Sequence, residues 1–340
     1  MSEAPARTDG SSPPAPLPVD APAPPPLRRL QVKTDGLTRS YGGKLALNNL
    51  NLSIAEGEIF GFIGPNGAGK TTTIRILAGL LLPTRGKAEV DGFDVTRDSR
   101  KVKEVVGYMP DSFGVYDNMT LLEYLDFFGA AFKIPRPKRK SVIRDVLELT
   151  DLTAKREDQV STFSRGMKQR ACLAKTLLHD PKVLLLDEPA SGLDPRARIE
   201  LRELLKELQR MGKTIIVSSH ILTELATFCN TVGIIEAGNL VAAGPVEEIL
   251  KSVRSSRRFV VELLEAADAQ RAAALLPQSH GVAEVRAEGR TIRFQLDATE
   301  LDVAGVVAGL SAERIRFTSF REELADLETA FLTLTKGDLA

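Results

Sequence analysis

The sequence predicts an α/β protein in which a parallel sheet forms the main domain and a smaller α+β domain follows. Two segments, Lys182–Pro189 and Lys213–His220, are apolar in consecutive positions rather than alternating, as in strands buried on both faces of a parallel sheet. Between them lies an expected helix, Pro195–Gly212, with leucines along one face. Strand, helix and strand in succession indicate an α/β core.

The flanking segments set the expected domain boundaries. Residues 1–29 hold nine of the 19 prolines and few large apolar side chains, so we expect a disordered tail. Residues 30–253 form the α/β domain, interrupted by a helical insert at about residues 108–160. Residues 257–340 follow the order strand, helix, two strands, helix and strand, with a final helix that ends at Leu334. This order predicts a small ferredoxin-like accessory domain.

Composition excludes several classes of protein. Lys plus Arg and Asp plus Glu are equal at 45 each, so no overall charge favours nucleic acid or an anionic membrane. The two cysteines, Cys172 and Cys229, lack disulfide or metal-site spacing and are expected to be core residues in a reducing compartment. The longest apolar runs, such as Ile74–Pro83, fall short of the roughly 18 to 20 residues of a membrane helix. We therefore expect a cytosolic protein that reaches a membrane through a partner.

Residues 64 to 72 carry the pattern G-x-x-x-x-G-K-[ST] between an apolar strand and a helix. Glycines there allow backbone N–H groups to surround phosphate oxygens, Lys70 can reach the terminal phosphates, and the Thr71 hydroxyl can ligate Mg²⁺. The alternative, a glycine-rich turn without a ligand, is disfavoured by the strand and helix on either side. The sequence thus predicts a nucleoside triphosphate site made of Gly64, Pro65, Asn66, Gly67, Ala68, Gly69, Lys70, Thr71 and Thr72.

Two acidic residues, Asp187 and Glu188, end the apolar strand of residues 182–189. The strand delivers Asp187 toward a metal ion, and Glu188 is placed to hold an attacking water molecule and accept its proton. An acidic pair after a strand is often a helix cap or a solvated turn. The phosphate loop upstream favours the catalytic interpretation.

The segment from residue 160 to residue 178 starts an expected helix with three basic side chains, Arg165, Lys168 and Arg170. Cations are disfavoured at this end of a helix, where unpaired N–H groups already carry partial positive charge. We therefore expect an anion to bind there. The alternative is local neutralisation by Glu157 and Asp158.

Taken together, these motifs resemble the ATPase subunit of an ABC transporter over residues 30–253, which implies the P-loop NTPase fold of ABC type. The stretch FSRGMKQR is similar to the family's signature loop, usually LSGGQ, with Ser164 and Gly166 at the serine and second glycine positions. It departs from the usual form at Arg165 and Met167. The resemblance implies a head-to-tail dimer, in which this helix start contacts the γ-phosphate of ATP held by the phosphate loop of a second subunit.

Other positions match the family singly. Tyr41 corresponds to the aromatic residue that stacks on adenine, and His220 to the histidine that contacts the γ-phosphate. Alone, each would be interpreted as structural. Residues 191–194 resemble the loop through which the two subunits sense each other. Asp111 stands where a glutamine is usual, and the resemblance implies a role in the metal site beside Asp187.

The resemblance implies that the protein binds and hydrolyses ATP with Mg²⁺, paired with an identical or related ATPase subunit, and drives export through a separate integral membrane permease. It would be peripheral at the cytoplasmic face of the cell membrane, touching the membrane only through that partner and binding no nucleic acid. The alternative is a soluble ABC ATPase acting on DNA or ribosomes, which a single cassette without a heptad array or cysteine cluster disfavours. A nucleotide kinase would leave the signature and His220 without roles.

Two further segments carry weaker signals. The basic run Lys133–Ser141 is interpreted as a solvated loop rather than a lipid or nucleic-acid site, because no aromatic residues are interleaved with its charges. The accessory domain has no cluster of catalytic side chains. It could join the ATPase subunits, regulate them or contact the permease, and we favour regulation or dimer support.

Overall fold

The structure, a computed structural model, describes residues 29–112, 118–221, 225, 227–253, 257–279, 281–296 and 300–323. The tail expected over residues 1–29 therefore lies outside the described residues, except for Arg29. The final helix expected to end at Leu334 lies outside them as well. Over the described ranges, every helix is too short or too polar to cross a membrane.

A central sheet of six strands dominates the described part of the main domain, in the order β10-β9-β3-β8-β7-β6. Successive residues along its strands are buried on opposite faces. In β7, for example, Leu184 and Leu186 join one hydrophobic core while Val183 and Leu185 join another. This two-sided burial explains the continuous apolar runs in the sequence. All neighbours are parallel except the edge strand β10, and the bounds are β3 (Ile59–Ile63), β6 (Val106–Met109), β7 (Val183–Leu186), β8 (Thr214–Ser219), β9 (Thr231–Glu236) and β10 (Asn239–Pro245).

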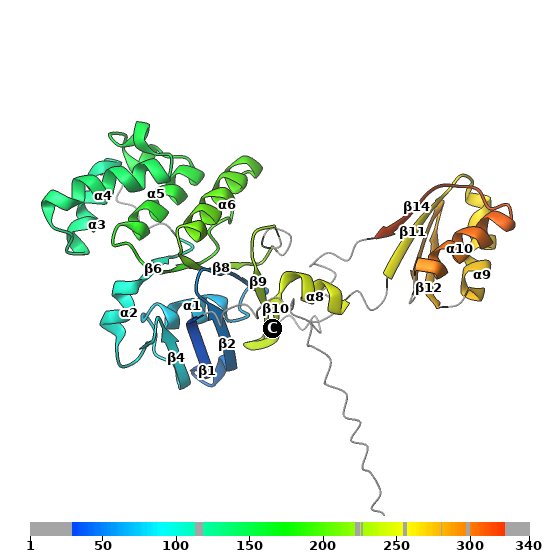
Figure 1. The fold of residues 1–340 in the computed structure, drawn as a ribbon, viewed down its shortest axis with the longest axis horizontal. Helices are drawn as coiled ribbons and strands as arrows, with labels where there is room; N and C mark the ends of the chain where they lie inside the picture. The colour runs from blue at the N-terminus through cyan, green and yellow to red at the C-terminus, as the bar shows by residue number, and fades with distance from the viewer. Residues whose placement is uncertain are drawn as a thin grey trace, which may run out of the picture.

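Two different layers cover the faces of this sheet (Figure 1). On one side lie α5 (Arg165–Leu177) and α6 (Pro195–Arg210), whose leucines share a core with β7 and β8. On the other side lie α1 (Lys70–Leu77) and an antiparallel sheet in the order β2-β1-β4-β5. The strands of that second sheet are β1 (Leu30–Tyr41), β2 (Lys44–Ala55), β4 (Arg85–Val90) and β5 (Phe93–Asp94), and α2 (Ser99–Val105) leads from it into β6.

The segment between β6 and α5 is helical over most of its described residues. It holds α3 (Leu121–Ala131) and α4 (Arg136–Leu149), which pack on α5 through side chains such as Tyr124. A capping box begins α3, because Thr120 and Glu123 each accept a hydrogen bond from the backbone N–H of the other. Two short 3₁₀ turns, Thr153–Lys155 and Val160–Thr162, complete the path to α5.

The prediction of a loop over Lys133–Ser141 is wrong for most of that segment, because α4 begins at Arg136. Pro137 lies in the first turn, where a missing backbone N–H costs no hydrogen bond. Ile143 and Leu147 then bury one face of the helix against the insert. Arg136, Lys138 and Lys140 are exposed on this helix, whereas Arg139 has only 14% of its side chain exposed and pairs with Asp126 of α3.

The described part of residues 257–323 forms a second unit with its own core, in which Phe259, Phe294 and Leu310 are buried. Its sheet has the order β12-β13-β11-β14, and all paired strands are antiparallel. Helices α9 and α10 contribute Ala272 and Val306 to the core. The elements are β11 (Arg257–Leu263), α9 (Ala269–Leu275), β12 (Val282–Glu288), β13 (Thr291–Leu296), α10 (Glu300–Ala312) and β14 (Phe317–Glu323), preceded by α8 (Val246–Val253).

The register of the parallel sheet brings the candidate site together. Ile63 pairs with Ser219 across β3 and β8, and Leu186 pairs with Val217 across β7 and β8. The phosphate loop, the acidic pair and His220 each follow one of these strands, so all three lie at the carboxyl edge of the sheet. Elsewhere in the core, Cys172 and Cys229 are free and buried, as expected.

Candidate active site

The loop between β3 and α1 is held close to neighbouring strands. A Cβ atom on Gly64 would lie 2.3 Å from the carbonyl oxygen of Ile235, so any larger residue would collide with β9. Gly69 has φ +114° and would place a Cβ atom 2.6 Å from the carbonyl oxygen of Ala46. Gly64 is therefore needed for space, and Gly69 for both space and backbone conformation. The predicted residues 64–72 thus form one tight turn that ends in the N-terminus of α1.

Lys70 begins α1 and is almost fully buried, with 4% of its side chain exposed. Its Nζ donates hydrogen bonds to the carbonyl oxygens of Gly64 at 2.6 Å and Pro65 at 3.0 Å. Burial lowers the pKa of Lys70, and the nearby charges of Glu188 and Asp187 act in the opposite direction. A buried ammonium group inside a loop of backbone N–H groups is suited to bind phosphate.

Asp187 lies directly beside the start of α1. Its Oδ1 atom accepts hydrogen bonds from Thr71 Oγ1 at 3.1 Å and from Ser218 Oγ at 2.7 Å. Its Oδ2 atom is buried and has no hydrogen-bond partner among the described residues. Burial is the main reason that the pKa of Asp187 is raised. One orphaned carboxylate oxygen next to a threonine hydroxyl is the oxygen-donor chemistry that Mg²⁺ prefers, so these residues fit the ion.

Glu188 connects three parts of the site. Its backbone has φ +47°, an uncommon conformation for a residue with a side chain, and its N–H donates to Ser218 Oγ at 2.9 Å. One carboxylate oxygen lies 3.8 Å from Lys70 Nζ, and the other lies 3.2 Å from Nδ1 of His220. The carboxylate is thus held between two cationic or hydrogen-bonding groups at the edge of the phosphate loop, where it can accept a proton from water.

Ser218 is a residue of this site that sequence reasoning missed. It lies at a position of β8 that is otherwise part of an apolar run, and it is fully buried. Its hydroxyl links Asp187 to the backbone of Glu188. A polar residue inside a buried strand needs a hydrogen-bond partner, and that requirement was the available signal.

Asp111 and Tyr41 lie at the ends of other strands. Asp111 is exposed after β6, and its charge contributes to raising the pKa of Asp187. Tyr41 ends β1 and is 47% exposed, with the guanidinium of Arg39 positioned 4.6 Å from the ring centroid. The charge of Asp111 therefore acts on Asp187, whereas Tyr41 is about half-exposed and has the Arg39 guanidinium over its ring.

The ion pairs around the start of α5 show which acidic residues neutralise its basic side chains. Glu157 and Asp158 form ion pairs with their neighbours Arg156 and Lys155, so the predicted alternative of local neutralisation is wrong. Arg170 instead pairs with Asp151 at 3.2 Å and lies 3.8 Å from Glu200. Within the described ranges, the other two cations, Arg165 and Lys168, form no ion pair.

Ser164 is the N-cap of α5, and its Oγ accepts the N–H of Met167 at 3.3 Å. The side chain is exposed, and Gly166 follows in the first turn. Since the first-turn N–H groups carry partial positive charge, the exposed cap, the bare glycine and two unneutralised cations together form a surface suited to an anion.

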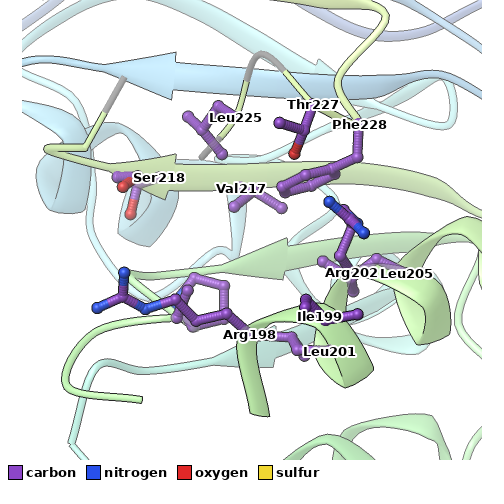
Figure 2. Close-up of a pocket in the computed structure, with 13 residues that line it drawn as sticks. Arg198, Ile199, Leu201, Arg202, Leu205, Val217, Ser218, Leu225, Thr227 and Phe228 are labelled. Atoms are coloured by element: carbon purple, nitrogen blue, oxygen red, sulfur yellow. The ribbon is translucent and has the colours of Figure 1, made fainter. Parts of the chain in front are cut away.

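A hollow of about 230 Å³ lies beside this site, between α6 and β8 (Figure 2). Its lining is mainly apolar, with side chains such as Leu205, Val217 and Phe228, and Arg202 also contributes. None of residues 64–72 lines it. It is therefore distinct from the phosphate loop, although Ser218 both lines it and donates a hydrogen bond to Asp187.

Comparison with known proteins assigns the family. The sequence family described as ABC transporter matches residues 47–191. Linearmycin resistance ATP-binding protein LnrL of Bacillus subtilis is 30% identical over 306 residues, which are 89% of this chain and 98% of that protein. The chain belongs to the ABC transporter family of ATP-binding proteins. Daunorubicin resistance ATP-binding protein DrrA3 of Streptomyces coeruleorubidus is 33% identical, covering 90% of this ABC protein and 96% of its own length.

A similar solved structure has the products of ATP hydrolysis bound. The dimeric post-hydrolysis state of an ATP-binding cassette, bound to ADP and phosphate, matches with a TM-score of 0.57 and 25% identity. It covers 63% of this chain and 98% of the solved chain. The predictions of an ABC-type P-loop fold, of an ATP-binding subunit and of ATP hydrolysis are confirmed. This ABC ATPase also has an additional antiparallel sheet at its C-terminal side.

The raised pKa of Asp187 predicts a pH-dependent stability difference. In the unfolded chain an Asp titrates near pH ~3.9, whereas burial raises the pKa of Asp187 in the folded protein. Ionisation of Asp187 therefore lowers the free energy of unfolding as the pH rises from the pKa of the unfolded state through the raised pKa of the folded state. Asp187→Asn keeps the Oδ1 acceptor and removes the charge. Without Mg²⁺ or nucleotide, we expect this variant to have a higher Tm than wild type at pH 8, by calorimetry.

The difference in Tm should shrink as the pH falls toward and below ~4, because the wild-type carboxyl is then increasingly protonated in the unfolded chain as well as in the folded protein. Asp145→Asn is a matched control, since the Asp145 side chain is 62% exposed on α4 and should show no such pH-dependent gain. If Asp187→Asn and wild type had the same Tm, or if their difference in Tm were the same at all pH values, the assignment of a buried charge would be contradicted.

Proposed function

We propose that this chain is the ATPase subunit of an export system, in which two subunits close around two ATP molecules and drive a separate integral membrane permease. The observation that carries the proposal is the placement of Glu188, between Lys70 and His220 at the rim of the phosphate loop. This arrangement puts a proton acceptor beside the position that a terminal phosphate would occupy. The subunit would work peripherally, at the cytoplasmic face of the membrane.

The phosphate loop provides the binding half of the mechanism. Backbone N–H groups of residues 64–72 surround the phosphate chain, and Lys70 neutralises its terminal charge. Thr71 and Asp187 would hold Mg²⁺, and Asp111, whose charge acts on Asp187, would contribute to the same site. The ion, when bound, neutralises charge that develops on the phosphate oxygens. The exposed ring of Tyr41 stacks on adenine.

Glu188 and His220 provide the catalytic half. Glu188 orients the attacking water molecule and takes its proton. Nδ1 of His220 lies 3.2 Å from that carboxylate and orients it. We assign to His220 the contact with the γ-phosphate as well. Ser218 positions both acidic residues through one hydroxyl group.

A second subunit completes each site in this proposal. Ser164 and Gly166 contact the γ-phosphate of ATP held by the other subunit, so the anion expected at the start of α5 arrives from across the dimer interface. Exposure of Ser164 and the lack of a local counter-charge for Lys168 in the described residues support this arrangement. The partner subunit is identical or closely related.

Export is favoured over work on DNA or ribosomes by two observations. The LnrL and DrrA3 proteins are named for resistance to linearmycin and to daunorubicin, and the similarity extends over about nine-tenths of this chain. The described residues hold no group of His, Cys, Asp and Glu side chains that could form a zinc site of the kind found in DNA-repair relatives. The transported molecule is handled by the permease.

Residues 257–340 form an accessory domain in this proposal, of ferredoxin-like type, downstream of an ATPase domain over residues 30–253 with its helical insert at about 108–160. The β12-β13-β11-β14 order, with every pair antiparallel, matches the pattern of two interleaved βαβ units. We assign it to regulation or dimer support. Deleting residues 257–340 should weaken ATP-driven dimerisation or change basal ATPase activity. Unchanged assembly, ATPase and transport would contradict this role.

The base role of Glu188 predicts a separation of binding from hydrolysis. Glu188→Gln should bind ATP with near-normal affinity but hydrolyse it at least ~100-fold more slowly, because the amide cannot accept the proton. The measurements are equilibrium binding of a fluorescent ATP analogue and phosphate release. Glu207→Gln is the control, since Glu207 is half-exposed on α6 and pairs with Arg210. Near-normal turnover in Glu188→Gln would remove Glu188 from this role.

Identifying the protein that co-purifies with this chain tests the export function directly. Affinity purification of full-length protein from detergent-solubilised native membranes should recover an integral membrane chain. Stable recovery of that chain should survive in Glu188→Gln with ATP, in which hydrolysis is blocked. Recovery of ribosomal or DNA-repair proteins in its place would favour the alternative function.

A further inference from the structure

We propose that Arg165 is a positioning residue that couples the two ATP sites, by linking the signature helix to the connection that follows Glu188 in the same chain. The inference rests on the proposed function. In a head-to-tail dimer, the start of α5 touches the ATP of one site, while Glu188 of the same subunit serves the other site. A side chain that joins these two parts of one subunit therefore lies between the two sites.

The contact itself is specific. Arg165 Nε donates a hydrogen bond to the carbonyl oxygen of Ser191 at 2.9 Å. The guanidinium also lies against Gly192, where a Cβ atom would be 2.7 Å from Arg165 Cζ and 2.8 Å from its Nε. Gly192 has φ +67°, and its bare Cα leaves the space that the guanidinium occupies.

Ser191 is one short turn away from the catalytic carboxylate. Its backbone N–H donates to the carbonyl oxygen of Glu188 at 3.1 Å, and its own carbonyl oxygen receives Arg165. Displacement of Arg165 would therefore act on the turn that follows Glu188, whose φ of +47° already makes it sensitive to its surroundings.

Two other contacts join α5 to the same connection. The side-chain amide of Gln169, which is buried, donates to the carbonyl oxygen of Pro189. Gly166 packs against the start of α6, where a Cβ atom on it would lie 3.3 Å from Cβ of Ala197. These contacts hold the backbone of the connection at both ends, and Arg165 holds its middle.

The charge of Arg165 makes this link responsive to a ligand. It forms no ion pair with any residue that the structure describes, and its hydrogen-bond acceptor is a neutral carbonyl group. A phosphate arriving at Ser164, one residue away, would attract the guanidinium more strongly than that carbonyl group does. Occupancy of the signature surface thereby changes the contact with Ser191. The glycine usual at this position of the signature offers no such side chain.

The test compares Arg165→Gly, Arg165→Lys and the control Arg196→Ala in the full-length protein, after a melting curve has confirmed folding. Arg196 is 90% exposed at the start of α6 and pairs with Glu200. ATPase rate is measured against ATP concentration, giving kcat, KM and the Hill coefficient. Binding of a fluorescent ATP analogue is measured separately at protein concentrations too low for dimerisation.

We expect cooperative hydrolysis in wild type and in Arg196→Ala. In Arg165→Gly the Hill coefficient should fall to about 1 and kcat should fall at least about 5-fold, the lower range of allosteric coupling. Nucleotide binding by the dilute subunit should be unchanged, because the phosphate loop is intact. Arg165→Lys should behave like Arg165→Gly, since a lysine keeps the charge but lacks the planar Nε donor.

Full rescue by Arg165→Lys would overturn the proposal, because charge alone at the partner's phosphate would then suffice. Unchanged cooperativity in Arg165→Gly would overturn it while leaving the dimeric ATPase mechanism standing. Non-cooperative hydrolysis by the wild type, without ATP-driven dimerisation, would remove the proposed function as well as this inference.

Discussion

One hydroxyl group, that of Ser218, holds the catalytic edge of the sheet together. It donates to the Asp187 carboxylate and accepts the backbone N–H of Glu188, so two acidic residues are fixed by the same side chain. The parallel pairing of β7 with β8 is what places the serine opposite them. Glu188, the residue after Asp187, has a left-handed backbone with φ +47°, and its carboxylate lies between Lys70 and His220.

The same edge keeps charged groups away from water at a cost to stability. Lys70 and Asp187 are both buried, and burial shifts the pKa of each toward its neutral form. The Oδ2 atom of Asp187 lacks a partner within the described residues. A protein can retain such buried groups when a ligand binds to them, because a ligand that binds only the native state stabilises that state by mass action. Phosphate beside Lys70 and a divalent cation beside Asp187 have the required charges.

The connection from Glu188 to α6 is a structural junction between two functions. It begins at Glu188, and α5 contacts it at Pro189, at Ser191 and near Ala197. The start of α5 and the loop that carries the proposed proton acceptor are therefore parts of one packed unit. In a symmetric dimer this packing makes independent behaviour of the two sites difficult, because each subunit contributes to both.

Much of this protein was determined by local sequence pattern alone. The apolar runs ending in Asp187 and His220, and the glycine loop before Lys70, depend on near neighbours along the chain, so their strands, turns and chemistry could be inferred without coordinates. The helix that begins at Arg136 was missed because its charges outweighed a buried face that only the neighbouring insert helix supplies.

Tertiary structure alone decided which distant groups meet. The pairing of Ser218 with Asp187, the turning of Glu188 between Lys70 and His220, and the contact of Arg165 with Ser191 all join residues at least 26 positions apart. Glu157 and Asp158 were available in sequence to neutralise α5, yet they pair with adjacent cations instead. Such contacts follow from strand register and helix packing, which are properties of the whole folded chain and leave no periodic trace in the sequence.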